Sequence, residues 1–379
     1  MGEWSNIKLG NACRITKGIQ FNRLNLDTSG DYPCINGGIA PSGYSPKWNT
    51  NENTITISEG GNSCGYVNFL KTKFWSGGHC YSLLDVKDSF DKNFLYQALK
   101  GMESLIMGLR VGSGLPNIQY KAISEFEFAY PKEKSEQEKI ASILSEADEA
   151  IEKIQNLIAK YQRIKIGMMQ DLLTKGIDSK GNIRSQTTHR FVIKNGMEVP
   201  KDWEVLNVKE FAKITTGSSD TQDKDSGGFY PFFVRSQTVE RSNRYIFDGE
   251  DVLTSGDGVG VGKIYHYING KIDFHQRVYL IYDFTKDKVL AKYFFYYFRE
   301  YFYNEVSKYS AKTTVDSVRL PMISDMLIPI PKFSEQEKII QALNEIEVFI
   351  ETESNSLAKL HSIKTGLMQD LLSGKVRVK

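Results

Sequence analysis

The sequence contains one segment twice, and this repeat constrains the fold more than any other feature. SEQEKI at 135–140 and IKIGMMQDLL at 164–173 both recur 199 residues later, as SEQEKI and IKTGLMQDLL. Superposing 135–173 on 334–372 without a gap gives 21 identities in 39 positions. The same offset pairs four residues near the start of each copy: Trp4 with Trp203, Ile15 with Ile214, Thr16 with Thr215 and Gly18 with Gly217. An internal repeat of this kind predicts one structural unit used twice.

The stretches between the repeated segments, roughly 20–120 and 220–320, have diverged widely. The order along the chain is therefore variable domain, similar helix, variable domain, similar helix. We predict four consecutive parts: variable domains at 1–130 and 179–330, and helical segments at 131–178 and 331–379.

The repeated segments are predicted to be helices because they lack internal proline and are rich in helix-favouring residues. Each begins with an S-x-x-E capping box, Ser135 with Glu138 and Ser334 with Glu337. The boundaries are marked by Pro131 and Pro331 before the helices and by Gly176 and Gly374 after them.

Apolar residues in both segments recur at alternating spacings of four and three, which predicts a coiled-coil seam. The seam residues are Ile140, Leu144, Ala147, Ile151, Ile154, Ile158, Tyr161, Met168 and Leu172, then Ile339, Leu343, Ile346, Ile350, Leu357, Leu360, Leu367 and Leu371. Lys165 and Lys364 interrupt the apolar seam at equivalent positions of the two copies, and Glu353 interrupts the seam of the second copy at one further position. We expect antiparallel helices, about 58 Å long at 1.5 Å per residue, that place the domains at opposite ends about a pseudo-twofold axis. Two separate amphipathic surface helices are the alternative.

The variable domains are predicted to be α/β (α+β) and rich in strand. The β-prone runs are NTITI at 53–57, YVNFL at 66–70, FYPFFV at 229–234 and VYLIY at 278–282. Each domain also has a predicted helix, near 91–107 and near 288–307. The glycine-rich SGDGVGVGK at 255–263 lacks the glycine and the Ser or Thr of a phosphate loop, so we expect a tight strand–turn–strand. Its glycines would also let the backbone approach a DNA phosphate or groove closely.

The sequence carries no recognisable catalytic or metal-binding motif. It has no Pro-Pro dipeptide, HExxH, GxSxG or EF-hand loop, and His79 and His275 are lone histidines that we interpret as structural. The cysteines, Cys13, Cys34, Cys64 and Cys80, form no CxxC pair, so we expect free thiols in a reducing compartment and no zinc site. We therefore predict no catalytic residue, no metal and no cofactor on this chain.

Composition limits the remaining classes of protein. The chain is 40% hydrophobic and 12% aromatic, which suits folded β-rich domains. The formal net charge is only +2, so a basic surface would have to be local. No N-terminal stretch resembles a signal peptide and no apolar run approaches membrane length, so we expect a cytoplasmic protein that does not bind membranes.

The pattern resembles the specificity subunits of type I restriction–modification systems. The resemblance rests on the tandem Trp…Ile-Thr-x-Gly openings, the SEQEKI…GMMQDLL and SEQEKI…GLMQDLL helices, and the connector THRFVIKNGMEVPKDWEV at 188–205. The stretches GSGLPNIQYKAISEFEFAYP and KTTVDSVRLPMISDMLIPIP also resemble that family. The likeness covers nearly the whole chain, although the divergent middles contribute little to it.

The resemblance implies a non-catalytic protein that reads double-stranded DNA. Each variable domain would be a target-recognition domain for one half of a bipartite, asymmetric site, and the helices would set the spacing. Two methyltransferase subunits and the restriction–translocase subunits would be the partners. S-adenosylmethionine, ATP and Mg²⁺ would then be bound by those partner subunits.

Candidate DNA contacts are polar residues close to the glycine turns, because Arg, Gln and Asn pair with base edges and Lys holds phosphate. In the first domain they are Lys17, Gln20, Asn22, Arg23, Asn36, Asn62, Lys71, Arg110 and Asn117. In the second they are Ser218, Arg235, Gln237, Arg241, Arg244, Lys263, Arg277, Lys312 and Thr313.

Candidate partner contacts are the positions at which both helices carry the same polar residue. A coiled coil needs only its apolar seam residues, so it does not explain why these polar residues are identical. They are Glu136, Gln137, Lys139, Gln170 and Asp171, with Glu335, Gln336, Lys338, Gln369 and Asp370. One partner bound twice would explain them, and recent duplication is the alternative.

Two other classes of function stay open: a coiled-coil scaffold for protein interactions without a DNA role, and a self-sufficient DNA methyltransferase or nuclease, whose motifs are missing.

Overall fold

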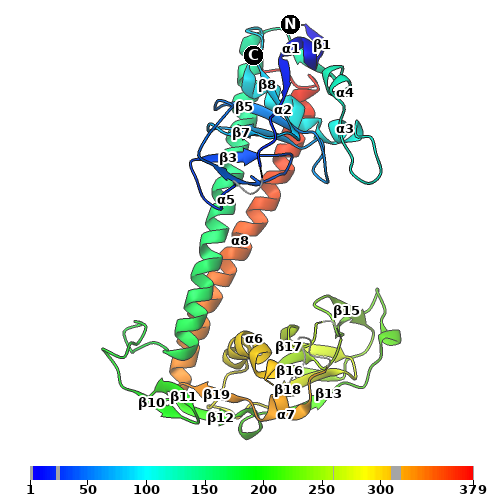
Figure 1. Cartoon of the computed structure of the whole chain (residues 1–379). Helices are drawn as coiled ribbons and strands as arrows, with labels where there is room; N and C mark the ends of the chain where they lie inside the picture. Colours follow the sequence, from blue (N-terminus) through cyan, green and yellow to red (C-terminus); the bar gives the residue numbers. More distant parts are fainter. Residues whose placement is uncertain (1–2, 23–25, 259, 309–316, 379) are drawn as a thin grey trace. The chain divides into compact units, whose positions relative to one another are not determined.

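The computed structural model describes residues 3–22, 26–258, 260–308 and 317–378 (Figure 1). The chain forms two compact units: unit 1 comprises 1–156 with 354–379, and unit 2 comprises 157–353. Each unit therefore combines one variable domain with a part of both repeated helices. These units cut across the four consecutive parts that the sequence predicts, because each domain packs on the helices beside it.

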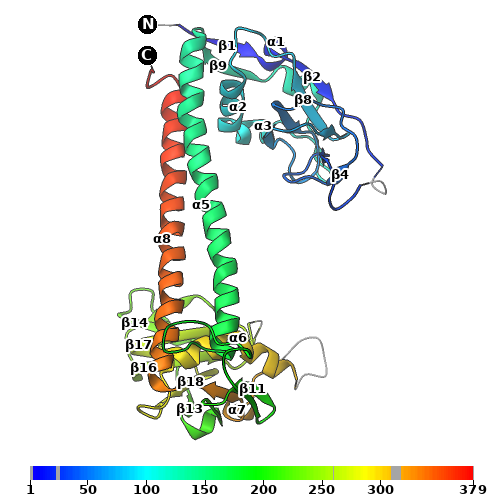
Figure 2. The same ribbon diagram turned by 90° about the vertical axis from the view of Figure 1, so that its left-hand side faces the viewer.

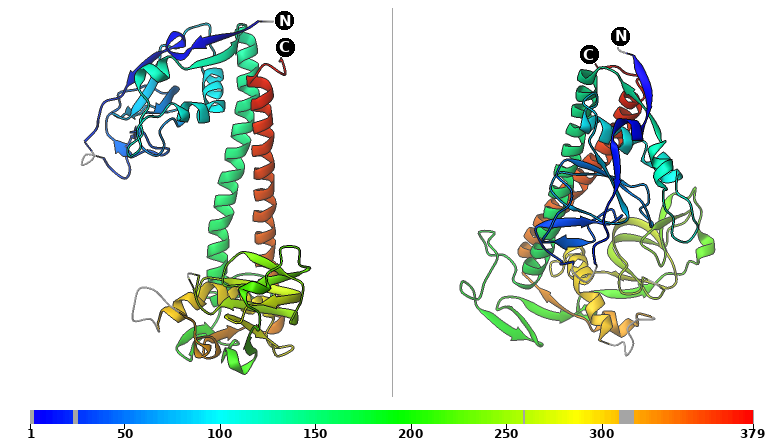
Figure 3. Two further views of the ribbon diagram at one scale, coloured as in Figure 1. Left: turned by 90° about the vertical axis from the view of Figure 1, so that its right-hand side faces the viewer. Right: turned by 45° about the horizontal axis from the view of Figure 1, so that its top comes forward.

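Both repeated segments are long helices, α5 (Lys134–Thr174) and α8 (Phe333–Leu372), drawn as uninterrupted ribbons in Figure 3. Their 41 and 40 residues correspond to about 60 Å each. The predicted glycine stops are confirmed, because Gly176 and Gly374 take φ angles of +66° and +73° after the last turns. The predicted capping boxes are wrong in position, since both helices begin one residue before Ser135 and Ser334.

The helices run antiparallel in each unit, as predicted (Figure 2). In unit 1 the Lys364 ammonium in the last part of α8 bonds the Asp148 carboxylate in the first part of α5. In unit 2 the Lys165 Nζ atom of α5 lies 2.6 Å from Glu347 Oε1 of α8. Asp148 and Glu347 occupy equivalent positions of the repeat, so each lysine that interrupts the apolar seam has a carboxylate on the facing helix.

Unit 1 holds nine strands and four short helices in its described residues. The strands are β1 (Trp4–Lys8), β2 (Arg14–Lys17), β3 (Tyr32–Ile35), β4 (Gly43–Ser45), β5 (Thr54–Ser58), β6 (Val67–Leu70), β7 (Trp75–Ser76), β8 (Cys80–Leu84) and β9 (Glu127–Pro131). The helices are α1 (Leu9–Ala12), α2 (Lys92–Gly101), α3 (Glu103–Gly108) and α4 (Tyr120–Ser124). The sheet orders are β2-β8-β5-β6 and β4-β3-β7, and β1 pairs with β9 at the entry to α5.

Unit 2 repeats this plan with a longer continuous sheet in the order β13-β18-β16-β17-β14-β15. Its strands are β10 (Phe191–Lys194), β11 (Met197–Pro200), β12 (Glu204–Asn207), β13 (Lys213–Thr216), β14 (Tyr230–Phe233), β15 (Val239–Ser242), β16 (Phe247–Ser255), β17 (Tyr265–Phe274), β18 (Val278–Tyr282) and β19 (Leu327–Ile330). Its α-helices are α6 (Ala291–Ser307) and α7 (Leu320–Ser324). β12 pairs with β19 as β1 pairs with β9, and β10 with β11 forms a hairpin of its own.

The pairing registers show that the two variable domains share one topology. β16 lies between β17 and β18 as β5 lies between β6 and β8, and the single strand β17 takes the places of β6 and β7. β14 pairs in parallel with the end of β17, as β3 pairs in parallel with β7. The predicted α/β domains with an internal repeat are confirmed, although their sequences have diverged.

A domain helix lies between the sheet and the long helices in each unit, as Figure 2 shows for α2 and Figure 1 for α6. In unit 1 the buried side chains of α2 join Ile140 and Leu144 of α5 and Leu371 of α8 in one core. In unit 2 the aromatic helix α6 packs with Leu172 of α5 and Leu343 of α8. The predicted seam residues near the helix ends are therefore buried against the domain as well as the facing helix. This packing explains why each domain and its helix ends form one compact unit.

Candidate functional site

The pairing registers bring several loops of unit 1 to one edge of its sheets. Lys17 at the end of β2 pairs with Tyr81, and Ser58 at the end of β5 pairs with Cys80, the first residue of β8. The last residue of β3, Ile35, pairs with Ser76. The loops that follow β2, β3 and β5, and the loop that precedes β8, must therefore converge.

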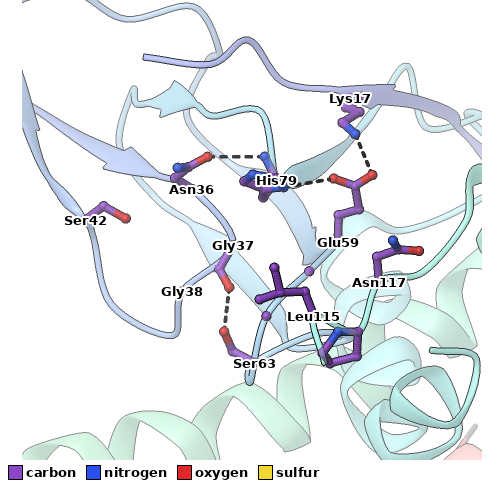
Figure 4. Close-up of a pocket in the computed structure, with 13 residues that line it drawn as sticks. Lys17, Asn36, Gly37, Gly38, Ser42, Glu59, Ser63, His79, Leu115 and Asn117 are labelled. Atoms are coloured by element: carbon purple, nitrogen blue, oxygen red, sulfur yellow. Dashed lines mark hydrogen bonds and ion pairs between the residues drawn. The ribbon is translucent and has the colours of Figure 1, made fainter. Parts of the chain in front are cut away.

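These loops line a pocket of about 520 Å³ (Figure 4). Its lining residues are Lys17, Asn36, Gly37, Gly38, Ser42, Glu59, Gly60, Gly61, Ser63, His79, Leu115, Pro116 and Asn117. Three predicted DNA contacts, Lys17, Asn36 and Asn117, meet there, although they are far apart in sequence.

The Glu59 carboxylate lies between Lys17 and His79 in the pocket lining (Figure 4). Its Oε1 atom is 2.5 Å from Lys17 Nζ, and its Oε2 atom is 3.5 Å from His79 Nδ1. The Glu59 side chain is only 12% exposed, whereas His79 is 61% exposed. The pocket walls are tied together because Ser63 Oγ donates to the Gly37 carbonyl at 2.5 Å and the His79 N–H donates to Asn36 Oδ1 at 3.2 Å.

Sequence reasoning missed Glu59 and assigned His79 a structural role. The glycines after Glu59 mark a turn, but nothing in the local sequence indicates which basic side chains that turn will meet. His79 is exposed and lines the pocket, and the interpretation of it as structural stays a prediction. His275 agrees with that interpretation, because it is 2% exposed and its Nδ1 atom accepts from the Arg277 N–H at 3.0 Å.

Unit 2 has the corresponding loop edge, with different side chains. The predicted strand–turn–strand at SGDGVGVGK is confirmed, because β16 ends at Ser255 and β17 begins at Tyr265. Asp257 in this turn accepts from Arg277 Nη1 at 2.6 Å and from Arg235 Nη1 at 3.1 Å. Burial alone would raise the pKa of Asp257, but the hydrogen bonds from Arg277 and Arg235 lower it below its ordinary value. The carboxylate is therefore ionised and holds both guanidinium groups.

The backbone supports the equivalence of the two edges. Gly60 forms a β-bridge with Asn117 in unit 1, and Asp257 forms one with Ser317 in unit 2. Each edge thus combines a turn after the central strand, a carboxylate and two basic groups. Such an edge offers charged donors and acceptors on a rigid frame, as recognition of a polar ligand requires.

The remaining predicted contacts of unit 2 have varied environments. Gln237 and Lys263 line a second pocket of about 470 Å³ together with Arg299 and Tyr303, which the sequence did not suggest. Arg244 Nη2 bonds Asp223 Oδ2 at 3.0 Å and Arg244 Nε bonds Asp273 Oδ2 at 3.3 Å, so this guanidinium is held by its own domain. Ser218 and Arg241 are exposed outside the two pockets.

The remaining predicted contacts of unit 1 are exposed, but they do not all lie at the loop edge. Asn62 belongs to the turn between β5 and β6 at that edge. Lys71 follows Leu70, which pairs with the first residue of β5, so it lies at the opposite edge. The other exposed candidates are Gln20, Asn22 and Arg110. Arg23, Lys312 and Thr313 lie outside the described residues.

The predicted partner contacts Gln137 and Gln336 are fully buried, and their hydrogen bonds to described residues stay within their own unit. Gln137 Nε2 donates to the Pro131 carbonyl at 2.9 Å, and its Oε1 accepts from the Asp91 N–H at 2.8 Å. Gln336 makes the matching bonds in unit 2, to the Pro331 carbonyl at 3.0 Å and the Leu290 N–H at 2.9 Å. We correct the prediction: these glutamines join each long helix to the loop before α2 or α6.

The predicted partner contacts Glu136 and Glu335 are buried as well, each at 6% exposure. The Glu136 oxygens accept from Arg377 Nε and Nη2, both at 2.6 Å, and these bonds lower the pKa of Glu136. The Glu335 oxygens accept from Arg184 Nη1 and Nη2, both at 2.8 Å. The identity at these two positions is therefore explained by contacts within the chain. Each glutamate lies at the start of one long helix and binds an arginine in the segment that follows the other long helix.

Six polar identities remain available on the helix surfaces. Lys139, Gln170, Lys338 and Gln369 are exposed, and Asp171 and Asp370 are half-buried. Asp171 pairs with Lys175 at 2.8 Å and Asp370 with Lys375 at 3.3 Å. The partner-contact prediction is therefore restricted to these six residues.

Replacing Gln336 by alanine should lower the free energy of unfolding by about 1–3 kcal/mol, because it leaves buried backbone groups without partners. The adjacent Glu337 is exposed, and its replacement by alanine should change the stability little. Thermal unfolding of both variants checks this. Equal shifts for the two variants would contradict the role given to Gln336.

The four cysteines are free, as expected, and the structure buries all of them. Burial raises the pKa of Cys13 to about 12 and that of Cys80 to about 11, so neither thiol ionises readily.

Among the described residues, no three His, Cys, Asp or Glu side chains are grouped so as to hold a metal ion. No helix in the described part of the chain combines the length and apolar composition of a membrane span.

Comparison with known proteins places these features in a family. Residues 1–161 and 200–362 match the type I restriction modification DNA specificity domain. The type I restriction enzyme MjaVIII specificity subunit of Methanocaldococcus jannaschii is 26% identical over 409 residues, which cover 100% of this chain and 94% of the relative. A putative type I specificity subunit of Mycoplasma genitalium is 33% identical over 164 residues, which cover 43% of this chain and 42% of that relative.

Solved structures agree in fold. The S subunit of a type I restriction–modification system from M. genitalium superposes with a TM-score of 0.75 at 19% identity, covering 98% of this chain and 96% of that chain. The ranges that match the family include the lining residues of the unit 1 pocket and the Arg235, Asp257 and Arg277 cluster of unit 2. The chain therefore belongs to the type I restriction–modification DNA specificity family.

Proposed function

We propose that this chain reads a bipartite, asymmetric DNA site, with one half-site bound at the loop edge of each unit. The observation that carries the proposal is the pair of equivalent loop edges with different side chains. Unit 1 presents Lys17, Glu59 and His79, and unit 2 presents Arg235, Asp257 and Arg277. The same frame with different donors and acceptors suits two readers of two different sequences.

The proposal separates recognition from catalysis. The chain itself would transfer no methyl group and cut no DNA, and the methyltransferase and restriction–translocase subunits would bind S-adenosylmethionine, ATP and Mg²⁺. A protein-interaction scaffold without a DNA role is the weaker candidate, because it does not require basic groups held by a carboxylate at both loop edges.

A domain exchange tests the proposed function. The chain is coexpressed with its methyltransferase subunit, and methylated adenines are mapped in DNA exposed to the complex. Replacing 20–120 by the corresponding segment of another family member should change one half-site and leave the other unchanged. A chimera that folds and methylates the original complete site would contradict the assignment of one half-site to unit 1. The chain without its partner, assayed with S-adenosylmethionine, should methylate nothing.

The remaining helix identities support two equivalent docking surfaces for a methyltransferase subunit. Lys139 of α5 and Lys338 of α8 are exposed at equivalent repeat positions. Lys139→Glu should weaken binding of one partner copy, and Lys338→Glu should weaken binding of the other. Native mass spectrometry of the assembled complex measures the copy number, and a wild-type chain that binds one copy at saturation would refute the two-surface proposal. Glu136 is unsuitable for this test, because reversing its charge would break the buried pair with Arg377.

A further inference from the structure

The cluster of Arg235, Asp257 and Arg277 has an arrangement suited to one particular base. Arg277 contacts Asp257 through Nη1 at 2.6 Å, and its side chain remains 62% exposed. Asp257 is only 18% exposed and is fixed by the turn, because its carbonyl accepts from Ser255 Oγ at 2.7 Å. The carboxylate therefore orients the guanidinium of an exposed arginine instead of burying it.

The geometry points to guanine as the base. We propose that Arg277 reads a guanine in the half-site bound by unit 2, with Asp257 as its positioning residue; this inference rests on the proposed DNA-reading function. The guanidinium carries five N–H donors, and the bond to Asp257 starts from Nη1. Guanine offers two neighbouring acceptors, O6 and N7, in the major groove, and a forked donor matches them both.

The other arginines of this edge are less suited to that contact. Arg244 engages Nε and Nη2 with Asp273, Asp223 and Ser219, so both nitrogens of this edge of its guanidinium already have partners. Arg235 also bonds Asp257, but at 3.1 Å and with a less exposed side chain, 43% against 62%. We assign to Arg235 the role of neutralising part of the negative charge of Asp257.

Unit 1 differs at the corresponding position. His79 directly precedes β8, and Arg277 directly precedes β18. The carboxylate partner in unit 1 is Glu59, and the pocket there is lined by no arginine among the described residues. An arginine directly before the strand is therefore present at this position in unit 2 and replaced by His79 in unit 1, which agrees with an asymmetric target.

Base analogues test the contact directly. Once the site is mapped, the assembled complex is titrated with duplexes in which each guanine of the unit 2 half-site is replaced in turn by 7-deazaguanine. This base keeps Watson–Crick pairing and lacks the N7 acceptor. One replacement should weaken wild-type binding about tenfold. The same replacement should have no further effect on Arg277→Ala, because the donor is already missing.

Three variants make the result specific. Arg277→Lys keeps the charge and loses the fork, so it should bind DNA but lose the preference for guanine at that position. Asp257→Asn should reduce the same preference while Arg277 is retained. Lys286→Ala is the matched control, because Lys286 follows β18 at the opposite edge of the sheet and its loss should leave the preference unchanged. Thermal unfolding shows that each variant is folded.

Two results would overturn the inference. Wild-type binding that is indifferent to 7-deazaguanine throughout this half-site would exclude the contact. An equal loss in wild type and Arg277→Ala would assign the guanine to another residue. In both cases specific DNA binding persists and the proposed function stands, whereas a complex without sequence-specific DNA binding would overturn both.

Discussion

Replacing Arg184 by alanine should lower the stability of unit 2 by about 3–5 kcal/mol, because it leaves a buried carboxylate without its cation. Arg184 and Glu335 are 9% and 8% exposed in their side chains and share two hydrogen bonds. Trp203 Nε1 also donates to Glu335 Oε2, at 3.3 Å. Urea unfolding followed by hydrogen exchange of unit 2 peptides measures the loss.

The equivalent pair in unit 1 provides the control. Arg377 also makes two hydrogen bonds to Glu136, through Nε and Nη2, but its side chain is 28% exposed, so water can replace more of its interaction. Arg377→Ala should therefore destabilise unit 1 less than Arg184→Ala destabilises unit 2. Combining Arg184→Met with Glu335→Gln removes both charges, keeps a side-chain oxygen that can accept a hydrogen bond at position 335, and should recover part of the loss. A double variant less stable than Arg184→Ala would contradict the buried-charge argument.

Replacing Asp251 by asparagine should stabilise unit 2 at alkaline pH. Asp251 is 4% exposed in β16, and burial raises its pKa to about 6 from an ordinary value of 3.8. The folded state then binds the proton more tightly than the unfolded state, so stability falls as pH rises between these two values and stays reduced above about 6. At pH 8 the gain from Asp251→Asn should approach about 3 kcal/mol, and it should vanish near pH 4.

The structural repeat suggests a second variant at this position. Asp251 pairs with Ile268 in β17, and Thr54, at the equivalent place in β5, pairs with Leu70 in β6. Asp251→Thr should therefore give a similar gain in unfolding free energy at pH 8. Asp248 lies on the same strand with an exposed side chain, so Asp248→Asn should change the stability little. Unfolding curves recorded at pH 4 and pH 8 decide the point. A stabilisation independent of pH would show that the buried charge is not its source.

Elements with a local cause were predicted well from the sequence. The four β-prone runs correspond to β5, β6, β14 and β18, and the predicted domain helices correspond to α2 with α3 and to α6. Side-chain periodicity and proline or glycine at a boundary act within a few residues, so they can be read without knowing the fold. The same holds for the repeat at offset 199, which is a property of the sequence alone.

The candidate site could be predicted only in part. Lys17, Asn36 and Asn117 were selected as polar residues near glycine turns, and they do meet in one pocket. Glu59 was missed because a carboxylate is an unusual choice for binding a polyanion. Its contacts depend on Lys17 and His79, which come from other parts of the chain.

The sequence by itself determined that one fold is used twice, with a long helix after each domain, because repeats and periodicity need no knowledge of distant contacts. Only the tertiary structure decided what the identical polar residues do. Gln137 and Glu136 look like surface residues of an amphipathic helix, yet both are buried by segments far away in the chain. Arg184 and Arg377 lie 193 residues apart, not 199, so the repeat does not align these two partners of the buried glutamates. Such pairings depend on which segments meet after folding, and local sequence patterns do not specify that.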